Sequence, residues 1–197
     1  MSVKVTDAWR GWYHINGNTY GTWLRGDDRG WRARHHREHV IGDYKNPPPK
    51  GLYREQLQIS KRLMGSPVRL GPDSRELACN TLVSSLQREA IEVIACCVTS
   101  NHFHLLARFT LPDTPGVWSN NRHQPIYGYI RHVVGKAKSA SALALSRSSR
   151  AEEGGVWAKR FKITPVTDRD HQLAVFRYIL RHQHQDGATW RFEQPKE

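Results

Sequence analysis

The chain has 197 residues, which is enough for one domain with a hydrophobic core and short for two. Lys and Arg total 30 against 18 Asp and Glu, so the formal net charge is +12. Most of the basic residues are Arg. Guanidinium groups pair bidentately with phosphate and stack on bases, so this excess predicts a polyanionic partner. No apolar run is long enough to span a membrane, and the first residues lack the apolar stretch of a signal peptide.

Cysteine usage indicates the compartment. Cys79, Cys96 and Cys97 are odd in number, two are adjacent, and no CxxC pair occurs. This pattern predicts neither a disulfide framework nor a cysteine-based zinc site. We therefore expect a reducing cytosolic environment and no membrane association.

The first third of the chain is the least regular part. Residues 12–24 are aromatic and β-branched with Gly breaks, which predicts an opening strand with a bulge. Residues 25–73 lack clean periodicity, and we expect a long basic insertion at about 31–72 with one short helix around Tyr53–Met64.

From residue 72 onward the pattern is regular. Asp73 or Ser74 is expected to cap a helix with an apolar stripe from Cys79 to Ala90. The next predicted elements are a hairpin of strands 91–98 and 102–109, a helix over 125–145, an extended segment over 156–164, and a helix from Thr167 and Asp168 to about Gln185 with Gly187 as its stop. The order β-α-β-β-α-β-α predicts an α+β fold, a ferredoxin-like antiparallel sheet with packed helices, within a single domain over 1–197.

The tripeptide His102-Phe103-His104 carries the clearest chemical signal. Residues two apart on a strand point to the same face, so His102 and His104 project together while Phe103 points into the core. Two adjacent imidazoles fill a core poorly and bind metals well. The alternative is a pair of structural histidines satisfied by neighbouring hydrogen bonds.

The last predicted helix adds two residues to this set. Tyr178 and His182 are four apart and share one helical face, beside an expected buried stripe of Leu173, Phe176 and Leu180. A metal-ligating residue one turn after a tyrosine can complete a metal site and present a phenolic hydroxyl beside it. The alternative is a tyrosine packed by its ring and a surface histidine.

These pieces together resemble a known family. The segment Cys97-Val-Thr-Ser-Asn-His-Phe-His-Leu-Leu106 resembles the histidine box of single-tyrosine HUH transposases, in which hydrophobic residues precede Pro-Asn-His-Val-His-Leu-Leu. Residues 17–30 resemble the start of many members of the REP-associated tyrosine transposase branch. Further segments resemble its central helix, closing strand and catalytic helix: 133–139, 156–160 and 178–182. The resemblance runs in order from about residue 12 to 190.

The resemblance implies a specific chemistry. Family members have the HUH endonuclease fold, commonly act as homodimers in the prokaryotic cytosol, and cut single-stranded DNA beside a hairpin. A tyrosine attacks the scissile phosphate, which leaves a 5′-phosphotyrosine and a free 3′-OH, and a divalent ion, Mg²⁺ or Mn²⁺, polarises the phosphate. Carried over, Tyr178 is the nucleophile and His102, His104 and His182 are the metal ligands.

The sequence departs from the family pattern at several positions. Ser100 replaces the usual Pro, and His182 replaces an amide or acidic ligand, so an all-histidine site would favour Mn²⁺, Zn²⁺ or Ni²⁺ over Mg²⁺. Other residues remain open as the third ligand: Gln183, His184 and Gln185. Tyr127 and Tyr129 are rival tyrosines, which we interpret as packing or DNA contacts.

Candidate DNA contacts occur in two regions. Trp23, Arg25 and Arg29 lie in a Gly-rich segment and are expected to stack on or contact bases at a hairpin. Basic residues of two later segments are expected to hold backbone phosphates: Lys136, Lys138, Lys159, Arg160 and Lys162. The His-rich cluster at 35–39 has no clear metal spacing and is interpreted as a basic loop. Two other readings stay open, a non-catalytic nucleic-acid-binding protein and a metal-dependent hydrolase that activates water.

Overall fold

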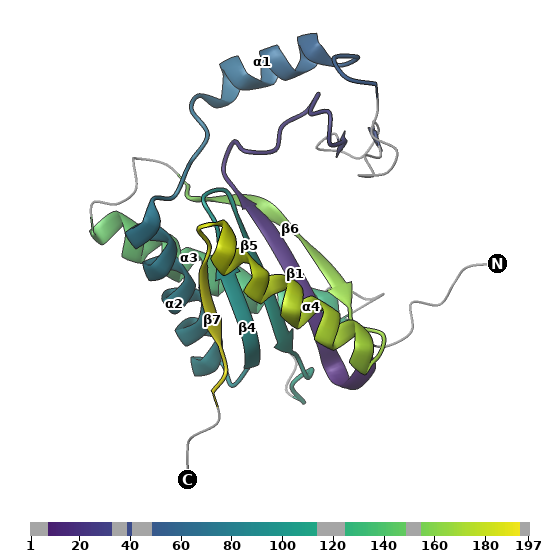
Figure 1. The fold of residues 1–197 in the computed structure, drawn as a ribbon, viewed down its shortest axis with the longest axis vertical. Coiled ribbons are helices and arrows are strands. Elements are labelled where there is room, and N and C mark those ends of the chain that lie inside the picture. Colours follow the sequence, from purple (N-terminus) through teal and green to yellow (C-terminus); the bar gives the residue numbers. More distant parts are fainter. Residues whose placement is uncertain (1–7, 33–38, 41–48, 114–124, 149–154, 194–197) are drawn as a thin grey trace, which may run out of the picture.

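The computed structural model describes residues 8–32, 39–40, 49–113, 125–148 and 155–193 (Figure 1). Residues 35–38 of the expected His-rich loop and most of the loops predicted at 111–124 and 146–155 lie outside the described residues, whereas His39 begins a two-residue strand. Within the described part, the strands are β1 (Trp12–Thr19), β2 (Trp31–Arg32), β3 (His39–Val40), β4 (Glu92–Val98), β5 (His102–Arg108), β6 (Trp157–Pro165) and β7 (Ala188–Arg191). The helices are η1 (Trp9–Gly11), α1 (Arg54–Met64), α2 (Pro72–Arg88), α3 (Pro125–Arg147), α4 (Arg169–Arg181) and η3 (His182–Gln185).

One five-stranded sheet organises the molecule, in the order β6-β1-β5-β4-β7. Every neighbouring pair is antiparallel. Four of these strands, in the order β6-β1-β5-β4, have the ferredoxin-like arrangement. In it, β1 and β5 occupy the centre, and β6 and β4 flank them. The predicted α+β class with a ferredoxin-like antiparallel sheet is confirmed.

Helices cover both faces of this sheet. In Figure 1, α4 crosses the front of the sheet while α2 and α3 lie behind it. The predicted stripes of the rear helices are buried except at Ala90, which is exposed beyond the end of α2. Leu86, Ile130 and Val134 have 0% exposure and pack in the same cluster as the sheet residues Ile15 and Phe103. Because side chains alternate along each strand, one face of the sheet packs against α2 and α3 and the other face packs against α4.

The orientation of α4 differs from the predicted one. Its buried residues are Val175 and Ile179, which pack on Trp12, Leu106 and neighbouring strand residues, whereas Leu173 is 38% exposed. The predicted stripe of Leu173, Phe176 and Leu180 is therefore wrong, although Phe176 does contact this cluster. The start of the helix is as predicted, because the Asp168 carboxylate accepts a hydrogen bond from the His171 backbone N–H at 2.8 Å.

The chain after α4 differs as well. The α-helix ends at Arg181 and a single 3-10 turn follows, in which Asp186 takes the left-handed conformation at φ +59°. Gly187 then passes so close to the preceding turn that a Cβ would lie 2.8 Å from the His182 carbonyl oxygen. The strand β7, which was not predicted, follows and pairs with β4 at the edge of the sheet.

The predicted opening strand ends early, at Thr19, and the chain then builds a separate feature. We call residues 20–32 together with α1 the arm, which lies beyond one end of the sheet (Figure 1). Its two parts are joined by close contacts: the Trp31 and Tyr53 rings pack edge-on at 5.5 Å, and the Ser60 hydroxyl donates to the Arg25 carbonyl at 3.0 Å. The helix α1 matches the one predicted around Tyr53–Met64, whereas the β2–β3 pair was not predicted.

Candidate metal centre

Strand alternation brings two histidines to the face that α4 covers. Phe103 is 1% exposed and packs toward α2 and α3, so His102 and His104 on either side of it point toward α4. His104 is 6% exposed, and the His102 side chain is half-buried at the end of β5. The two rings stand edge to face, with their centroids 4.9 Å apart.

The rotation of α4 supplies the third histidine. Because Val175 and Ile179 dock on the sheet, His182, one turn after Tyr178, is buried at 6% exposure. Its ring centroid lies 5.5 Å from that of His102 and 5.1 Å from that of His104. One ring nitrogen from each of the three histidines lies within 4.8 Å of the others. The three predicted ligands therefore converge on one point.

Hydrogen bonds to the protein orient all three rings. The Nδ1 atom of His102 is 2.7 Å from the Asn101 side-chain oxygen and 2.8 Å from the Thr99 hydroxyl. In His104, Nδ1 is 2.9 Å from Nε2 of His14, and in His182 it is 3.0 Å from the Tyr178 carbonyl oxygen. An Nδ1–H that donates to each partner leaves Nε2 as a lone pair for a metal ion, the arrangement common around protein-bound metals.

The electrostatics of the cluster favour neutral rings. Burial, aided by the neighbouring charges of His14, His102 and His182, lowers the pKa of His104 to about 2 from 6.5. Burial likewise lowers the pKa of His102 to about 4, with further contributions from His182 and Arg29. Metal ions bind the deprotonated imidazole, so these rings are ready to act as ligands at neutral pH.

Tyr178 stands beside the histidines and partly in solvent. Its hydroxyl is 3.4 Å from His104 Nε2, and its ring packs edge-on to His104 at 5.0 Å and to His182 at 4.9 Å. The residue is 43% exposed. Burial of the hydroxyl, followed by the charge of Cys97, raises the pKa of Tyr178 above 10, so the phenol is protonated at neutral pH. The geometry thus offers a reachable hydroxyl next to a prospective metal site.

Sequence reasoning missed His14, which lies on β1. Its ring stacks on His104 with centroids 5.1 Å apart and an interplanar angle of 28°. Burial, together with the charges of His171, Lys162 and His182, lowers the pKa of His14 to about 4. The available signal was the alternation of polar residues at His14, Asn16 and Asn18 between buried neighbours. That period of two places all three on the face of the sheet that carries His102 and His104.

The open alternatives lie elsewhere. Gln183, His184 and Gln185 are exposed in η3, whereas His182 is buried, and His184 is not part of the cluster of ring nitrogens. Tyr129 is buried on α3 behind the sheet, and the Tyr127 ring packs edge-on to Tyr13 at 6.1 Å in the same layer. Both rival tyrosines therefore stand on the face opposite to the histidines.

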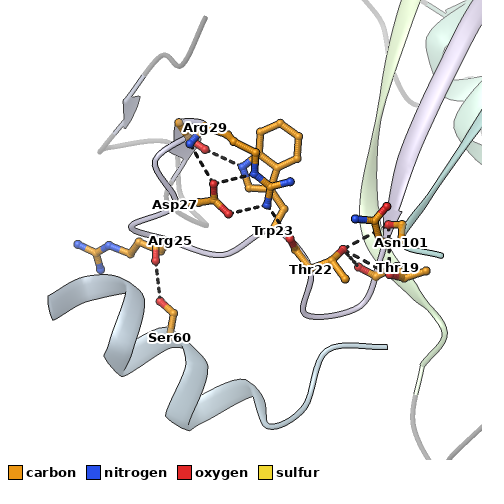
Figure 2. Close-up of polar contacts among 9 residues, drawn as sticks. Thr19, Thr22, Trp23, Arg25, Asp27, Arg29, Ser60 and Asn101 are labelled. Atoms are coloured by element: carbon orange, nitrogen blue, oxygen red, sulfur yellow. Dashed lines mark hydrogen bonds and ion pairs between the residues drawn. The ribbon is translucent and has the colours of Figure 1, made fainter. Parts of the chain in front are cut away.

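The candidate DNA contacts of the arm are held in a defined network (Figure 2). Arg29 is paired with Asp27 at 2.5 Å, donates to the Thr22 carbonyl at 2.7 Å and lies over the Trp23 ring at 4.6 Å. Trp23 is 45% exposed, and its indole N–H donates to the Gly30 carbonyl at 2.6 Å. The Arg25 guanidinium lies 5.1 Å from the Trp31 ring centroid.

The same network continues to the metal candidates. The Thr22 hydroxyl donates to the Asn101 carbonyl at 3.3 Å, and the side chain of Asn101 in turn holds His102 (Figure 2 labels Thr22 and Asn101). The arm is thus hydrogen-bonded directly to the turn that positions the first histidine.

The remaining basic candidates lie on the strand β6 and the helix α3. Lys159, Arg160 and Lys162 are exposed on β6. Lys136 on α3 forms an ion pair with Glu89. Lys138 is 7% exposed, its ammonium donates to the Ala158 carbonyl at 2.7 Å, and burial lowers its pKa to about 8. The Lys138 ammonium thus forms a hydrogen bond that links α3 to β6.

Comparisons with known proteins give a likeness to a solved structure. The sequence matches no family model and no curated protein. A solved structure of a REP-associated tyrosine transposase bound to a REP hairpin is similar in fold, with a TM-score of 0.42 and 9% sequence identity. The match covers 94% of this chain and 74% of the other. A likeness of this size assigns neither a family nor an activity to the chain. Among the described residues, no helix combines the length and apolar character that crossing a bilayer requires.

Proposed function

We propose that the protein is a metal-dependent endonuclease and strand transferase, a transposase-type enzyme, that acts on single-stranded DNA beside hairpins. The observation that carries this proposal is the convergence of His102, His104 and His182 within 4.8 Å, with the Tyr178 hydroxyl 3.4 Å from His104. The resemblance of residues 97–106 and 178–182 to the HUH histidine box and tyrosine helix points to the same chemistry.

The donor set suits a divalent transition metal. Three imidazoles with their Nδ1 atoms bonded to protein present three Nε2 lone pairs, and such nitrogen ligands favour Mn²⁺, Zn²⁺ or Ni²⁺ over Mg²⁺. His102, His104 and His182 would hold the ion, and Mn²⁺ is the one we expect to support activity, with Mg²⁺ a weaker substitute. When bound, the ion would supply Lewis-acid polarisation of the scissile phosphate.

Tyr178 would act as the nucleophile. Its oxygen forms a bond to the scissile phosphorus while the bond from phosphorus to the 3′-oxygen breaks, so the 5′ end becomes a phosphotyrosine. The phenolic proton is lost and the departing 3′-oxygen gains one, which leaves a free 3′-OH. Because the phosphodiester bond energy is kept in the tyrosyl ester, a 3′-OH can later reverse the reaction and join a new strand.

The basic surface supports a nucleic-acid substrate. The arm offers an exposed indole with a guanidinium stacked over it, a combination that suits unpaired bases and backbone phosphate. Lys159, Arg160 and Lys162 are exposed on β6, at the opposite edge of the sheet from β7. The proposal includes a homodimer and a location in the prokaryotic cytosol, where chromosomal DNA is found.

Cleavage of labelled oligonucleotides tests this function. A pool of hairpins with single-stranded flanks, incubated with the wild-type protein and Mn²⁺, should give shortened strands on denaturing gels. Tyr178→Phe and His104→Ala should each abolish the products, while Tyr127→Phe, behind the sheet, should leave them unchanged. Products that persist in Tyr178→Phe would instead favour a hydrolase that activates water. Binding without products in any metal would favour a non-catalytic nucleic-acid-binding protein.

A further inference from the structure

The face of β1 beside the histidines is only partly covered by α4. The helix contacts β4, β5 and β7 and buries Trp12 at the start of β1. The next residues on this face, His14, Asn16 and Asn18, are half-exposed, whereas Tyr13, Ile15 and Gly17 between them are buried. The second half of β1 therefore offers a polar strip to solvent, next to the candidate metal centre.

Strand register places this strip directly against the histidines. Asn16 is paired with His104, and Asn18 is paired with His102. Residues directly opposite on antiparallel strands carry neighbouring side chains on one face, with Cβ atoms about 5 Å apart. Each asparagine is thus the immediate neighbour of one metal-ligand candidate.

The two asparagine amides have no hydrogen-bond partners among the residues that the structure describes. Each amide carries two donors and an acceptor. Polar side-chain groups that are withdrawn from solvent ordinarily have hydrogen-bond partners in side chains or backbone. Their open hydrogen-bonding capacity is available to a ligand that approaches the histidines from the side of β1.

A positive charge borders the strip on its other side. Lys162 of β6 is paired with Asn16 across the β1–β6 ladder, so its side chain lies on the same face. It is close enough for its charge to contribute to the lowered pKa of His14. The row Lys162, Asn16 and His104 therefore combines a cation for phosphate, an amide for a base edge, and a metal-ligand candidate.

We infer that this strip is the seat of one unpaired nucleotide, adjacent to the phosphate that Tyr178 attacks, and that Asn16 and Asn18 select its base. This inference rests on the proposed function. An amide donor and acceptor can pair with the edge of an exposed base, which in a duplex is occupied by the complementary strand. Lys162 holds a neighbouring backbone phosphate and adds affinity without base selection.

Selection from a sequence library tests this inference through binding alone. Tyr178→Phe protein is mixed with fluorescein-labelled hairpins that carry a randomised single-stranded flank, with Mn²⁺ present, and the bound fraction is sequenced. We expect enrichment of one base, by roughly tenfold, at one flank position. Asn16→Ala and Asn18→Ala, each added to Tyr178→Phe, should remove that enrichment. Asn80→Ala, an exposed asparagine on α2, is the matched control and should leave it unchanged.

Lys162 gives a second readout of the same seat. Lys162→Ala should lower the affinity for all library members alike and reduce the salt dependence of binding by about one phosphate contact. Arg88→Ala removes one positive charge from the exposed end of α2, behind the sheet, and should change neither. Equal base preference in the parent and in the Asn16→Ala and Asn18→Ala proteins, or no preference in the parent, would overturn the inference.

Two further measurements separate this result from the proposed function. Mn²⁺ affinity, measured by calorimetry, should be the same in Asn16→Ala and in the parent, which shows an intact histidine cluster. If the wild-type protein cleaves the hairpin pool while the base preference is absent, only the seat is contradicted. If the wild-type protein does not cleave, the proposed function is contradicted, and the selection still reports on the seat.

Discussion

His104 is the residue on which the candidate site depends most. One of its ring nitrogens faces His14 at 2.9 Å and the other faces the Tyr178 hydroxyl at 3.4 Å. These contacts hold the ring between β1 and α4. A partner that fixes the tautomer and direction of a metal-bound imidazole commonly contributes to metal affinity.

The first prediction concerns His14. His14→Ala should weaken Mn²⁺ binding by roughly 10- to 100-fold, because Nδ1 of His104 loses its hydrogen-bond acceptor. His14→Gln, whose side-chain oxygen can accept the same hydrogen bond, should restore much of the affinity. Isothermal titration calorimetry measures both. Equal affinity in wild type and His14→Ala would show that the contact does not orient the ligand.

The second prediction is a pH dependence of stability without metal. The pKa values of His14, His102 and His104 lie at about 4, 4 and 2, below their ordinary value of 6.5. Between pH 6.5 and 4 the unfolded chain therefore binds more protons than the folded one. The contribution of these histidines to the free energy of unfolding should be fully present above pH 6.5 and should decrease as the pH drops toward 4.

The size and test of this effect follow from the same values. One unit of pKa separation corresponds to about 1.4 kcal/mol, and solvent screening reduces this for the half-exposed His14 and His102. Urea unfolding at pH 7.5 and pH 5 measures the change. Stability that is unchanged or higher at pH 5 would contradict it. Asp27 contributes little to the difference in stability between these two pH values, because its pKa is lowered from 3.8 and lies below this window.

At the level of elements, α4 decides whether the cluster forms. The helix carries Tyr178 and is followed directly by His182, its C-cap, and its docking through Val175 and Ile179 turns both residues toward the sheet. A helix that presented Leu173 and Leu180 to the sheet would rotate His182 away from His102. The packing of two apolar side chains thus sets the geometry of the polar site.

The third prediction tests this coupling. Ile179→Ala should lower the free energy of unfolding by about 2–4 kcal/mol, since it leaves a cavity under a fully buried side chain. It should also weaken Mn²⁺ binding, because the position of His182 becomes less defined. Leu173→Ala, on the exposed side of the same helix, should change the free energy of unfolding by less than about 0.5 kcal/mol. Chemical unfolding and calorimetry report the two quantities, and equal effects of both variants would contradict the docking.

The elements also show what sequence patterns can and cannot supply. The stripes of α2 and α3 are interrupted by polar residues, so their periodicity identified the buried face. In α4, by contrast, Leu173, Ala174, Val175 and Phe176 are consecutive and apolar, so several faces fit a helical period and the contact with Trp12 and Leu106 selects one. The four-residue strand β7 has little pattern of its own and is defined by pairing with β4.

Part of the candidate site was predictable, because local spacing identifies residues that share one face of a strand or helix. The strand alternation of His102 and His104 and the helical spacing of Tyr178 and His182 are local, so the sequence indicated both pairs. His14 lies 90 residues from His104 in the chain, and only the β1–β5 pairing joins them. The partners of the Nδ1 atoms, Asn101 among them, became visible only with the three-dimensional arrangement.

At the level of the whole molecule, the charge of +12 and the arm set the context of the site. The arm is tied to the sheet next to the turn that holds His102, through Thr22 and Asn101. Under the proposed function, a DNA strand bound along the arm would lead toward the histidines, Tyr178 and the polar strip of β1. The arm, the three clustered histidines and Tyr178 thus lie together at one end of the sheet.

Mapping of a covalent adduct tests the central claim most directly. The wild-type protein is incubated with the hairpin pool and Mn²⁺, denatured, treated with nuclease and digested, and its peptides are analysed by mass spectrometry. We predict a nucleotide attached through a 5′-phosphate to the peptide that contains Tyr178, and no such peptide without metal or with Tyr178→Phe. An adduct on another residue such as Tyr127, or strand cleavage with no adduct on Tyr178, would contradict the assignment of Tyr178 as the nucleophile.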